Sequence, residues 1–461
     1  MRTTPYSVAG TSLDRRAFLG LVGFAAGTAL LAACGAPSNG GDKVMLTFWT
    51  PGGGGDFCAR LDAIAADFHD HYPSLSVGPT QCGAGEQEFT EVLLARVAAG
   101  NPPDAALLWT SPAALGARGS LLPLDELMRR AQYAQAENWP AAVLASCRFE
   151  GKTYGLPITA GSCALCYNRD LFEQRGIPSG RNDFPKTWDE LRRLSREFTV
   201  WKEDRLEIAG FIPWHVAEEL PVWSALNGSH LYDAVNRRYT IDAEPNIAMM
   251  AYAVDWLNEE YQGDFAKVNR SGNWEGYELE GRRPAFMDQR QAVVLAYSWN
   301  MGEPAHAQSA FRWDVARLPV GPGGRKTVAG YWPNWLVIPK GARHVAQAFT
   351  WLDYLSGVGV KAWVSHFPDL PTNRKVPPEI LPTALIEGKG QAFARDIMTF
   401  FRGQLDLATS MWDSPVQDFA TDQIKRALEQ IMYKVMRPRD ALAEAQKACQ
   451  RALEKVLKAG A

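Results

Sequence analysis

Tryptophan, carboxylate and amide side chains are the groups in this sequence whose types and positions could form a binding site. The chain has 16 Trp among 461 residues, and several stand beside Gly, Pro or Asn, where predicted strands end and loops begin. A flat ring can cover an apolar face of a ligand while carboxylates and amides bind its hydroxyl groups. This combination suits a sugar, although most Trp side chains in any protein fill the core.

We expect the ligand at the carboxyl ends of the predicted strands, because open α/β sheets bind ligands there. The predicted contacts from the N-terminal part are Asp56, Gln81, Glu86 and Trp109. Later strand ends and loops supply Trp214, Ser298, Trp299, Asn300, Tyr331, Trp332, Trp412 and Asp413. Trp188, Trp256, Trp351 and Trp363 lie on helical patterns instead, and we predict that they fill the core.

Other motifs that could carry chemistry are incomplete. Gly52–Gly55 lacks both the glycine spacing of a dinucleotide site and the Lys-Ser/Thr of a P-loop. Cys163 and Cys166 lie in a predicted strand, whose alternation would point the two thiols to opposite faces. No second cysteine pair completes a zinc site, and His69-x-His71 is too small for a metal site. We therefore expect no cofactor and no metal.

An exported carbohydrate-active hydrolase is a competing interpretation. It would need two carboxylates about 5–10 Å apart across a glycosidic bond. Glu218, Glu219 and Asp413 could be arranged in this way, but nothing in their spacing demands it. The sequence also has no Gly-x-Ser-x-Gly nucleophile motif. The residues favour a binding protein without catalytic groups over an enzyme.

Alternating strand and helix patterns predict the scaffold that positions these residues. Val44–Trp49, Leu75–Val77 and Ala105–Trp109 read as strands, because they are short apolar runs bounded by Pro, Gly or Asn. Apolar residues at helical spacing lie between them, over Leu61–Phe68 and Phe89–Ala99. This alternation predicts a parallel sheet with crossover helices.

The pattern continues beyond a break near residue 150. Ile158–Cys166, Ile208–Pro213 and Arg290–Trp299 read as strands, and Ile247–Asn258 reads as a helix. Thr187-Trp-Asp-Glu190 has the form of a capping box and predicts the start of another helix.

The N-terminus resembles an export and anchoring signal. Arg15 and Arg16 precede an apolar run from Ala17 to Ala33, which is the arrangement of a twin-arginine signal. The run is interrupted by glycines and is short for a membrane-spanning helix, although an uncleaved anchor helix is the alternative. Leu31-Ala-Ala-Cys34 resembles a lipobox, which implies cleavage before Cys34 and its lipidation. We expect residues 1–33 to be the signal and residues 34–43 to be a lipidated tether.

Length and charge limit the remaining possibilities. Without 33 signal residues, 428 of the 461 remain, which is enough for two domains. The net charge of −3 argues against nucleic acid as a partner.

Several short motifs in a fixed order resemble the extracellular solute-binding proteins of ABC importers. The resemblance is to the large carbohydrate-binding group that includes maltose-binding protein. The motifs are Leu46-Thr-Phe-Trp49, Phe68–Pro73, Gly100-Asn-Pro-Pro-Asp104, Gly151–Pro157, Tyr167-Asn-Arg-Asp-Leu-Phe172, Thr187-Trp-Asp-Glu-Leu191, Gly281–Phe286, Leu318–Gly324, Gly330-Tyr-Trp332 and Ala441–Ala448. They span nearly the whole chain after Cys34. The sequence departs from the family at Gly161–Cys166, where plain apolar residues are usual.

The resemblance implies an α/β fold of two lobes, each a mainly parallel sheet flanked by helices, with a ligand cleft between them. We expect residues 44–159 and 295–343 in lobe one, and residues 160–294 and 344–461 in lobe two. The chain would cross between the lobes near residues 159–161, 290–295 and 339–344. Periplasmic binding proteins close around their ligands by such a hinge, and the ligand favours the closed form.

The implied function is capture of a sugar by closure of the lobes, followed by its delivery to an ABC transporter permease. The protein would act as a monomer, on the outer face of the cell membrane or in the periplasm. The same fold could instead bind a glycerol phosphodiester or a polyamine. The absence of Arg among the strand-end residues argues against an anion, whereas a polyamine stays open.

Cysteine pairing is not determined by the sequence. Cys58 and Cys82 would lie in adjacent strand-end loops, and an exported protein can form disulfides. We predict that these two residues are bridged.

Overall fold

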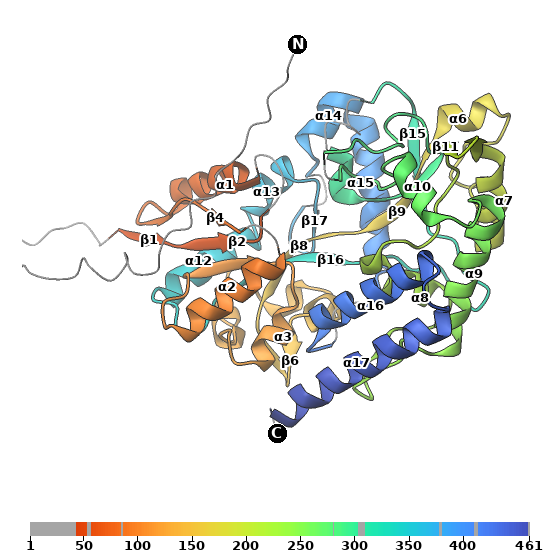
Figure 1. Cartoon of the computed structure of the whole chain (residues 1–461). Helices are drawn as coiled ribbons and strands as arrows, with labels where there is room; N and C mark the ends of the chain where they lie inside the picture. The colour runs from red at the N-terminus through yellow and green to blue at the C-terminus, as the bar shows by residue number, and fades with distance from the viewer. Residues whose placement is uncertain are drawn as a thin grey trace, which may run out of the picture. The chain divides into compact units, whose positions relative to one another are not determined.

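The computed structural model describes residues 43–52, 57–83, 86–279, 281–302, 309–377, 380–409 and 414–459. Residues from Lys43 to Ala461 form one compact unit, shown in Figure 1. The predicted signal, Cys34 and the tether up to residue 42 lie outside the described residues. No helix in the described ranges is long and apolar enough to cross a membrane.

A six-stranded sheet organises the first lobe, with the strand order β17-β8-β16-β5-β2-β4. The strands are β2 (Phe48–Thr50), β4 (Gln81–Cys82), β5 (Ala105–Leu108), β8 (Leu156–Gly161), β16 (Trp332–Val337) and β17 (Leu370–Pro371). β2 runs parallel to β4 and β5, as predicted, whereas β16 is antiparallel to β5 and β8. A parallel pair of β1 (Val44–Leu46) and β3 (Leu75–Val77) stands beside it.

Helices with one apolar face cover this sheet. They are α1 (Phe57–His71), α2 (Glu86–Ala98), α3 (Pro112–Ala117), α4 (Asp125–Met128), α5 (Ala141–Ala145), α12 (Val345–Leu355) and α13 (Val360–His366). On α1 the residues Leu61, Ile64, Ala65 and Phe68 are buried, which confirms the predicted helical period. Trp351 and Trp363 are also buried in this core, as predicted.

A three-stranded antiparallel sheet organises the second lobe, with the order β14-β9-β15, whereas the prediction gives each lobe a mainly parallel sheet. Its strands are β9 (Cys163–Asn168), β14 (Val293–Tyr297) and β15 (Trp313–Ala316). The surrounding helices are α6 (Arg169–Gln174), α7 (Trp188–Phe198), α8 (Leu220–Leu226), α9 (Glu244–Glu260), α10 (Phe265–Ser271), α14 (Thr383–Lys389), α15 (Gln391–Leu405), α16 (Gln417–Met432) and α17 (Pro438–Ala459). The predicted capping box at the start of α7 is confirmed, with Thr187 and Glu190 each bonding the backbone of the other.

Shorter elements complete the described chain. They are the strand pairs β6 (Arg148–Phe149) with β7 (Lys152–Thr153), β10 (Val200–Lys202) with β11 (Arg205–Ile208) and β12 (Tyr232–Asp233) with β13 (Arg238–Tyr239), and the 3-10 turns η1 (Ala136–Asn138), η2 (Ala217–Glu219) and η3 (Ser298–Gly302).

The structure divides the chain between the lobes differently from the predicted boundaries. β14 and β15 pair with β9 in the second lobe, although the prediction places residues 295–343 in the first. α12 and α13 pack on the first sheet, although the prediction places residues 344–461 in the second lobe. A strand pattern does not reveal which sheet the strand joins, because that choice depends on contacts distant in sequence.

The crossings between lobes follow from these pairings. The chain leaves β8 and enters β9 at Ser162, beside the predicted crossing at residues 159–161. It returns at residues 329–331, between β15 and β16, rather than at residues 290–295. The third crossing follows β17 and precedes α14, so it lies after residue 371 rather than at residues 339–344.

Candidate functional site

An aromatic cluster stands where the two sheets meet, and it contains two of the predicted ligand contacts. Trp299 stacks on Tyr297 with ring centroids 4.3 Å apart and planes 9° apart. Trp332 meets Trp299 edge-on at 5.9 Å and Tyr297 at 5.0 Å. Trp299 and Trp332 are only partly buried. Partly exposed, rigid rings of this kind can pack on the apolar face of a ligand.

Strand pairing brings this cluster together. Trp332 begins β16 and lies opposite Gly161, the last residue of β8. Gly161 leaves room for the indole of Trp299, since a Cβ at Gly161 would overlap that ring. Ser162 then connects the crossings, because its hydroxyl donates to the carbonyl of Gly330 at 3.0 Å. Its amide also donates to the hydroxyl of Ser298 at 3.3 Å.

Trp109, a third predicted contact, is held beside the cluster by Asn334. The indole Nε1 of Trp109 donates to Oδ1 of Asn334 at 2.9 Å. Asn334 lies two residues after Trp332 on β16, opposite Thr159 of β8. Phe57 contacts the Trp109 ring at 5.9 Å from the first turn of α1. The three predicted Trp residues are therefore linked through one stretch of β16.

A buried carboxyl group lies behind the stacked rings. Tyr297 donates its hydroxyl to Oε1 of Glu219 at 2.6 Å. Burial, together with the nearby Glu275 carboxylate, raises the pKa of Glu219 to about 8. A carboxyl group with this pKa is mostly protonated at neutral pH, and it can accept from Tyr297 without adding a full charge to the site.

An ion pair borders the same cluster. Nε2 of His215 lies 2.8 Å from Oε1 of Glu275, and both side chains are about 15% exposed (14% and 15%). Burial opposes the charge on His215, but attraction to Glu275 outweighs it and raises the pKa of His215. Burial likewise opposes the charge on Glu275, and His215 lowers its pKa. Tyr277, 6.4 Å from Tyr297 between ring centroids, continues the aromatic surface.

Trp214 does not belong to the site, contrary to the prediction. Its side chain is 1% exposed and lies among Trp188, Trp223 and Trp256, with Trp188 at 4.5 Å. Trp188 and Trp256 are core residues, as predicted. Trp214 does not stand at a strand end, because β11 ends at Ile208, and rings from α7, α8 and α9 enclose its side chain.

Ser298 and Asn300 are buried supports rather than exposed contacts. Ser298 bonds Ser162 as described, and Oδ1 of Asn300 accepts from the amide of Tyr297 at 3.3 Å. Both side chains are at most 1% exposed. Their polar groups hold the turn that carries Trp299.

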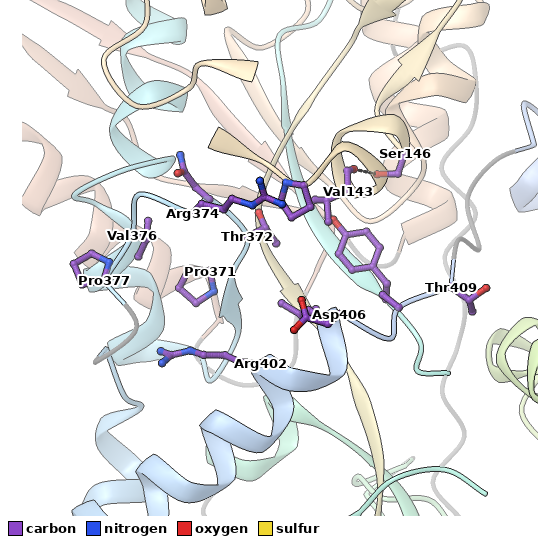
Figure 2. Close-up of a pocket in the computed structure, with 15 residues that line it drawn as sticks. Val143, Ser146, Pro371, Thr372, Arg374, Val376, Pro377, Arg402, Asp406 and Thr409 are labelled. Carbon is purple, nitrogen blue, oxygen red and sulfur yellow. Dashed lines mark hydrogen bonds between the residues drawn. The ribbon is translucent and has the colours of Figure 1, made fainter. Parts of the chain in front are cut away.

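Tyr331 and Trp332 separate, although both are predicted as ligand contacts. Neighbours in an extended segment point to opposite sides. Tyr331 is buried in the first-lobe core and lines a cavity of about 470 Å³. Figure 2 shows Pro371, Arg374 and Asp406 lining the same cavity. The cavity lies among the crossing segments and does not include the Trp pair.

Gln81 lies on the edge strand of the first sheet, and Glu86 lies at the start of the next helix. Gln81 is exposed on β4, opposite Trp49, and Glu86 begins α2. The side chain of Glu86 lies outside the described part of the chain. Asp56, Trp412 and Asp413 also lie outside the described residues.

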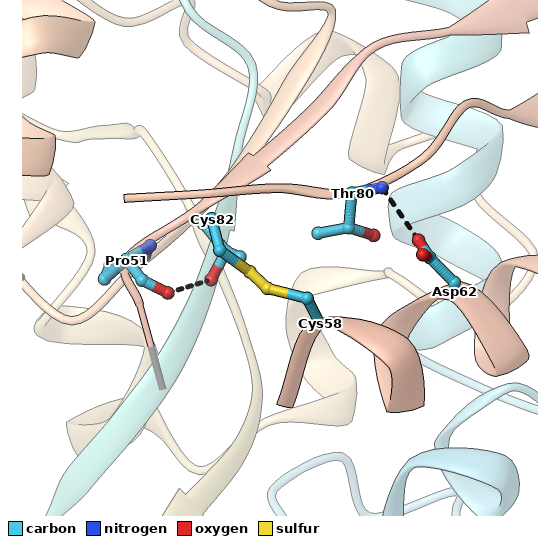
Figure 3. Close-up of a disulfide and its surroundings, with 6 residues drawn as sticks. Pro51, Cys58, Asp62, Thr80 and Cys82 are labelled. Carbon is cyan, nitrogen blue, oxygen red and sulfur yellow. Dashed lines mark hydrogen bonds between the residues drawn. A yellow bond between two sulfur atoms is a disulfide. The ribbon is translucent and has the colours of Figure 1, made fainter. Parts of the chain in front are cut away.

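A disulfide joins Cys58 to Cys82, as Figure 3 shows, with Cα atoms 6.4 Å apart. It connects the first turn of α1 to the end of β4, which carries Gln81. Thr80 strengthens the same junction, since its amide donates to Asp62 of α1 at 2.7 Å. The remaining cysteines in the described ranges, Cys147, Cys163, Cys166 and Cys449, are free and buried.

The sequence did not single out Asn334, Thr159, His215 or Glu275 as parts of the site. It also did not single out Asp369, whose Oδ2 accepts from the amide of Asn334 at 2.9 Å. Asn334 and Thr159 are polar residues inside otherwise apolar strands, which is the signal that could have identified them. His215 directly follows the predicted contact Trp214. Nothing in the sequence pattern brings Glu275 or Asp369 to this place.

Known proteins resemble this chain over most of its length. A family model described as bacterial extracellular solute-binding protein matches residues 60–362, well over half of the chain. A curated relative, the multiple sugar-binding protein of Streptococcus mutans, is 22% identical over 346 residues, covering 73% of this chain and 77% of that protein.

Two solved structures share the fold. The structure of CpMnBP1 with mannotriose bound has a TM-score of 0.72 and 21% identity, covering 88% of this chain and 100% of the other. The ABC substrate-binding protein Lmo0181 of Listeria monocytogenes, in complex with cycloalternan, has a TM-score of 0.74 and 17% identity, covering 90% of this chain and 100% of the other. The family model describes a solute-binding component of transport and no enzyme, and the chain belongs to the family of bacterial extracellular solute-binding proteins.

Proposed function

We propose that this chain captures a sugar, a di- or oligosaccharide, for an ABC-type importer and releases it to the membrane permease. The observation that carries the proposal is the partly exposed aromatic group of Trp109, Trp299 and Trp332, which lies at the junction of the two lobes. Apolar ring faces beside amide and carboxyl groups suit a molecule with C–H faces and hydroxyl edges. The sugars named for the similar proteins support the same ligand class.

Closure of the lobes would couple binding to transport. The three crossing segments would act as the hinge, and a ligand held between Trp109 of the first lobe and Trp299 of the second would favour the closed form. The permease would distinguish the closed protein from the open one. This requires tighter binding of ligand to the closed state than to the open state.

An anionic ligand fits the described site less well than a sugar. The charged groups around the aromatic cluster are His215 and Glu275, which neutralise each other, and the carboxyl group of Glu219. A glycerol phosphodiester would need an unpaired cation, which these residues do not supply. A polyamine would need ionised carboxylates, whereas Glu219 is mostly protonated at neutral pH.

Export and anchoring follow from the N-terminal motifs together with the family. We propose that the signal of residues 1–33 directs export, and that lipidated Cys34 holds the protein on the outer face of the membrane. Replacement of Cys34 by Ser should release the protein into the soluble fraction. Retention of the Cys34→Ser protein in the membrane would show that something other than this lipid holds it.

A thermal-shift screen of the mature, unlipidated protein tests the sugar assignment. The panel contains mono- and oligosaccharides, with spermidine and glycerol phosphates as alternatives. Ligand at a hundredfold excess over its Kd stabilises the folded state by about 2.7 kcal/mol, so its melting temperature rises. A rise with a saccharide that is lost in Trp332→Ala supports the proposal, whereas a rise only with spermidine or a glycerol phosphate overturns it.

A further inference from the structure

Asn334 occupies a central position beside the aromatic cluster. It lies in β16 between the positions of two aromatic contacts, since Trp332 precedes it by two residues and Trp109 bonds its side chain. Thr159 faces it from β8, and Pro371 of β17 faces Thr159 from the other side. Asn334 thus lies in a row of residues across the three strands β16, β8 and β17, with Trp109 just past the end of β5.

Hydrogen bonding leaves the Asn334 amide one orientation. Its Nδ2 donates to Oδ2 of Asp369 at 2.9 Å and to the hydroxyl of Thr159 at 3.0 Å. The same Oδ2 accepts from the indole N–H of Trp363, so it acts as an acceptor, and the amide nitrogen of Asn334 has to face it. The amide oxygen consequently faces Trp109, whose indole has a single N–H to donate. If the amide were rotated by half a turn, its oxygen would face Oδ2 of Asp369. Its N–H groups would then face the N–H of Trp109.

Asp369 is itself firmly held. It is 6% exposed, and its Oδ2 also accepts from the indole of Trp363 at 2.9 Å. Trp363 is fully packed in the first-lobe core on α13. Because a buried carboxylate without partners is very costly, this arrangement resists changes in the position of Asp369. The rigid core is thereby connected through Asp369 and Asn334 to the partly exposed Trp109.

We propose that Asn334, oriented by Asp369, is a positioning residue that holds the Trp109 ring in place for stacking on the ligand. The N–H of Trp109 is used inside the protein, so the ring offers the ligand its apolar surface and no donor. The contact with Phe57 at 5.9 Å supports the ring from α1. This inference rests on the proposed sugar site, but the placement of Trp109 by Asn334 can be measured without any ligand.

The first measurement is the indole N–H spectrum of the ¹⁵N-labelled, ligand-free protein. Trp109→Phe identifies the Trp109 signal by its loss. Asn334→Ala should move that signal upfield, because the hydrogen bond at Nε1 is removed, and should leave the signal of Trp351 in place. An unchanged Trp109 signal in folded Asn334→Ala overturns the proposal, whether or not the protein binds a sugar.

The second measurement is a double-mutant cycle on sugar affinity, with maltotriose and mannotriose as probes. Asn334→Ala should weaken binding by about tenfold, the loss of one well-oriented contact. In the Trp109→Ala background the same substitution should change the affinity less than about twofold, since Asn334 acts through that ring. Equal losses of about tenfold in both backgrounds would mean that Asn334 acts on the ligand directly, and would overturn the positioning role.

A milder variant keeps the inference testable if Asn334→Ala does not fold. Thr159→Val removes one of the two acceptors of the Asn334 amide and the long, 3.5 Å hydrogen bond from Thr159 to Asp369, but it keeps the 2.9 Å bond between Asn334 and Asp369. The Trp109 indole signal should broaden or shift in Thr159→Val. In the separate variant Thr159→Ser, which keeps the hydroxyl, the signal should stay at its wild-type position. If Thr159→Val leaves the signal unchanged, or Thr159→Ser moves it as much as Thr159→Val does, then Asn334 and Thr159 do not set the position of the Trp109 ring. Failure of every saccharide of the thermal-shift panel to bind would contradict the proposed function, and the indole result alone would then decide the role of Asn334.

Discussion

Replacement of Gly161 by Ala should damage both the fold and the binding site through one steric contact. Gly161 is buried at the end of β8, and its φ lies outside the left-handed region, so alanine fits the backbone. The new Cβ would overlap two ring carbons of Trp299. That ring cannot move away freely, because it stacks on Tyr297 at 4.3 Å and meets Trp332 at 5.9 Å.

The expected magnitude follows from two opposing effects. Overpacking of a buried position costs about 1–3 kcal/mol. A glycine-to-alanine change in a compatible backbone otherwise stabilises by about 0.4–1 kcal/mol, because it restricts the unfolded chain. We therefore expect Gly161→Ala to lower the free energy of unfolding by about 1–2 kcal/mol. Displacement of Trp299 should weaken sugar binding at least about tenfold, which corresponds to about 1.4 kcal/mol.

Urea denaturation and calorimetric titration with the sugar from the screen measure the two effects. Gly403→Ala on α15 is the matched control, since its Cβ would meet no atom within 4 Å. It should stabilise the protein by up to about 1 kcal/mol and leave binding unchanged. In the Trp299→Ala background, the steric penalty of Gly161→Ala should disappear. Gly161→Ala with unaltered stability and affinity would refute the packing argument and the role of Trp299.

Three further predictions concern the bridge, the buried acid and the core. Denatured, unlipidated protein lacking Cys34 should show four reactive thiols, and six after reduction; loss of the Cys58–Cys82 bridge should cost about 2–4 kcal/mol, as urea denaturation would reveal. Glu219 binds its proton more tightly in the folded than in the unfolded state, so stability should fall as pH rises from the ordinary value of 4.5 to about 8. Glu219→Gln should flatten that slope in urea titrations at several pH values, and an unchanged slope would contradict the assignment. Trp214→Ala should cost about 3–5 kcal/mol in unfolding free energy, whereas Trp332→Ala should mainly reduce sugar affinity. A loss of affinity without a loss of stability in Trp214→Ala would contradict its assignment to the core.

Local patterns in the sequence account for much of the architecture. The apolar spacing of α1 and the capping box of α7 appear in the structure as predicted, because both depend on residues within a few positions of one another. The helical Trp residues are buried for the same reason. Trp109 and Trp299, predicted at strand ends, and Trp332, predicted in a loop, lie near one another in the structure, and their contact with a ligand stays a prediction.

Tertiary structure alone decided which of these residues meet. Trp214 and Trp299 have similar sequence surroundings, yet helices bury the first and the junction of the sheets exposes part of the second. Asn334 meets Trp109 and Thr159 only because β16 lies between β5 and β8, which brings it to these partners, 225 and 175 residues away along the chain. Such pairings depend on the packing of the whole lobe, whereas helix periods and caps depend on a few neighbouring residues. The sequence by itself therefore determined the elements and the kinds of side chain, and the fold determined the site.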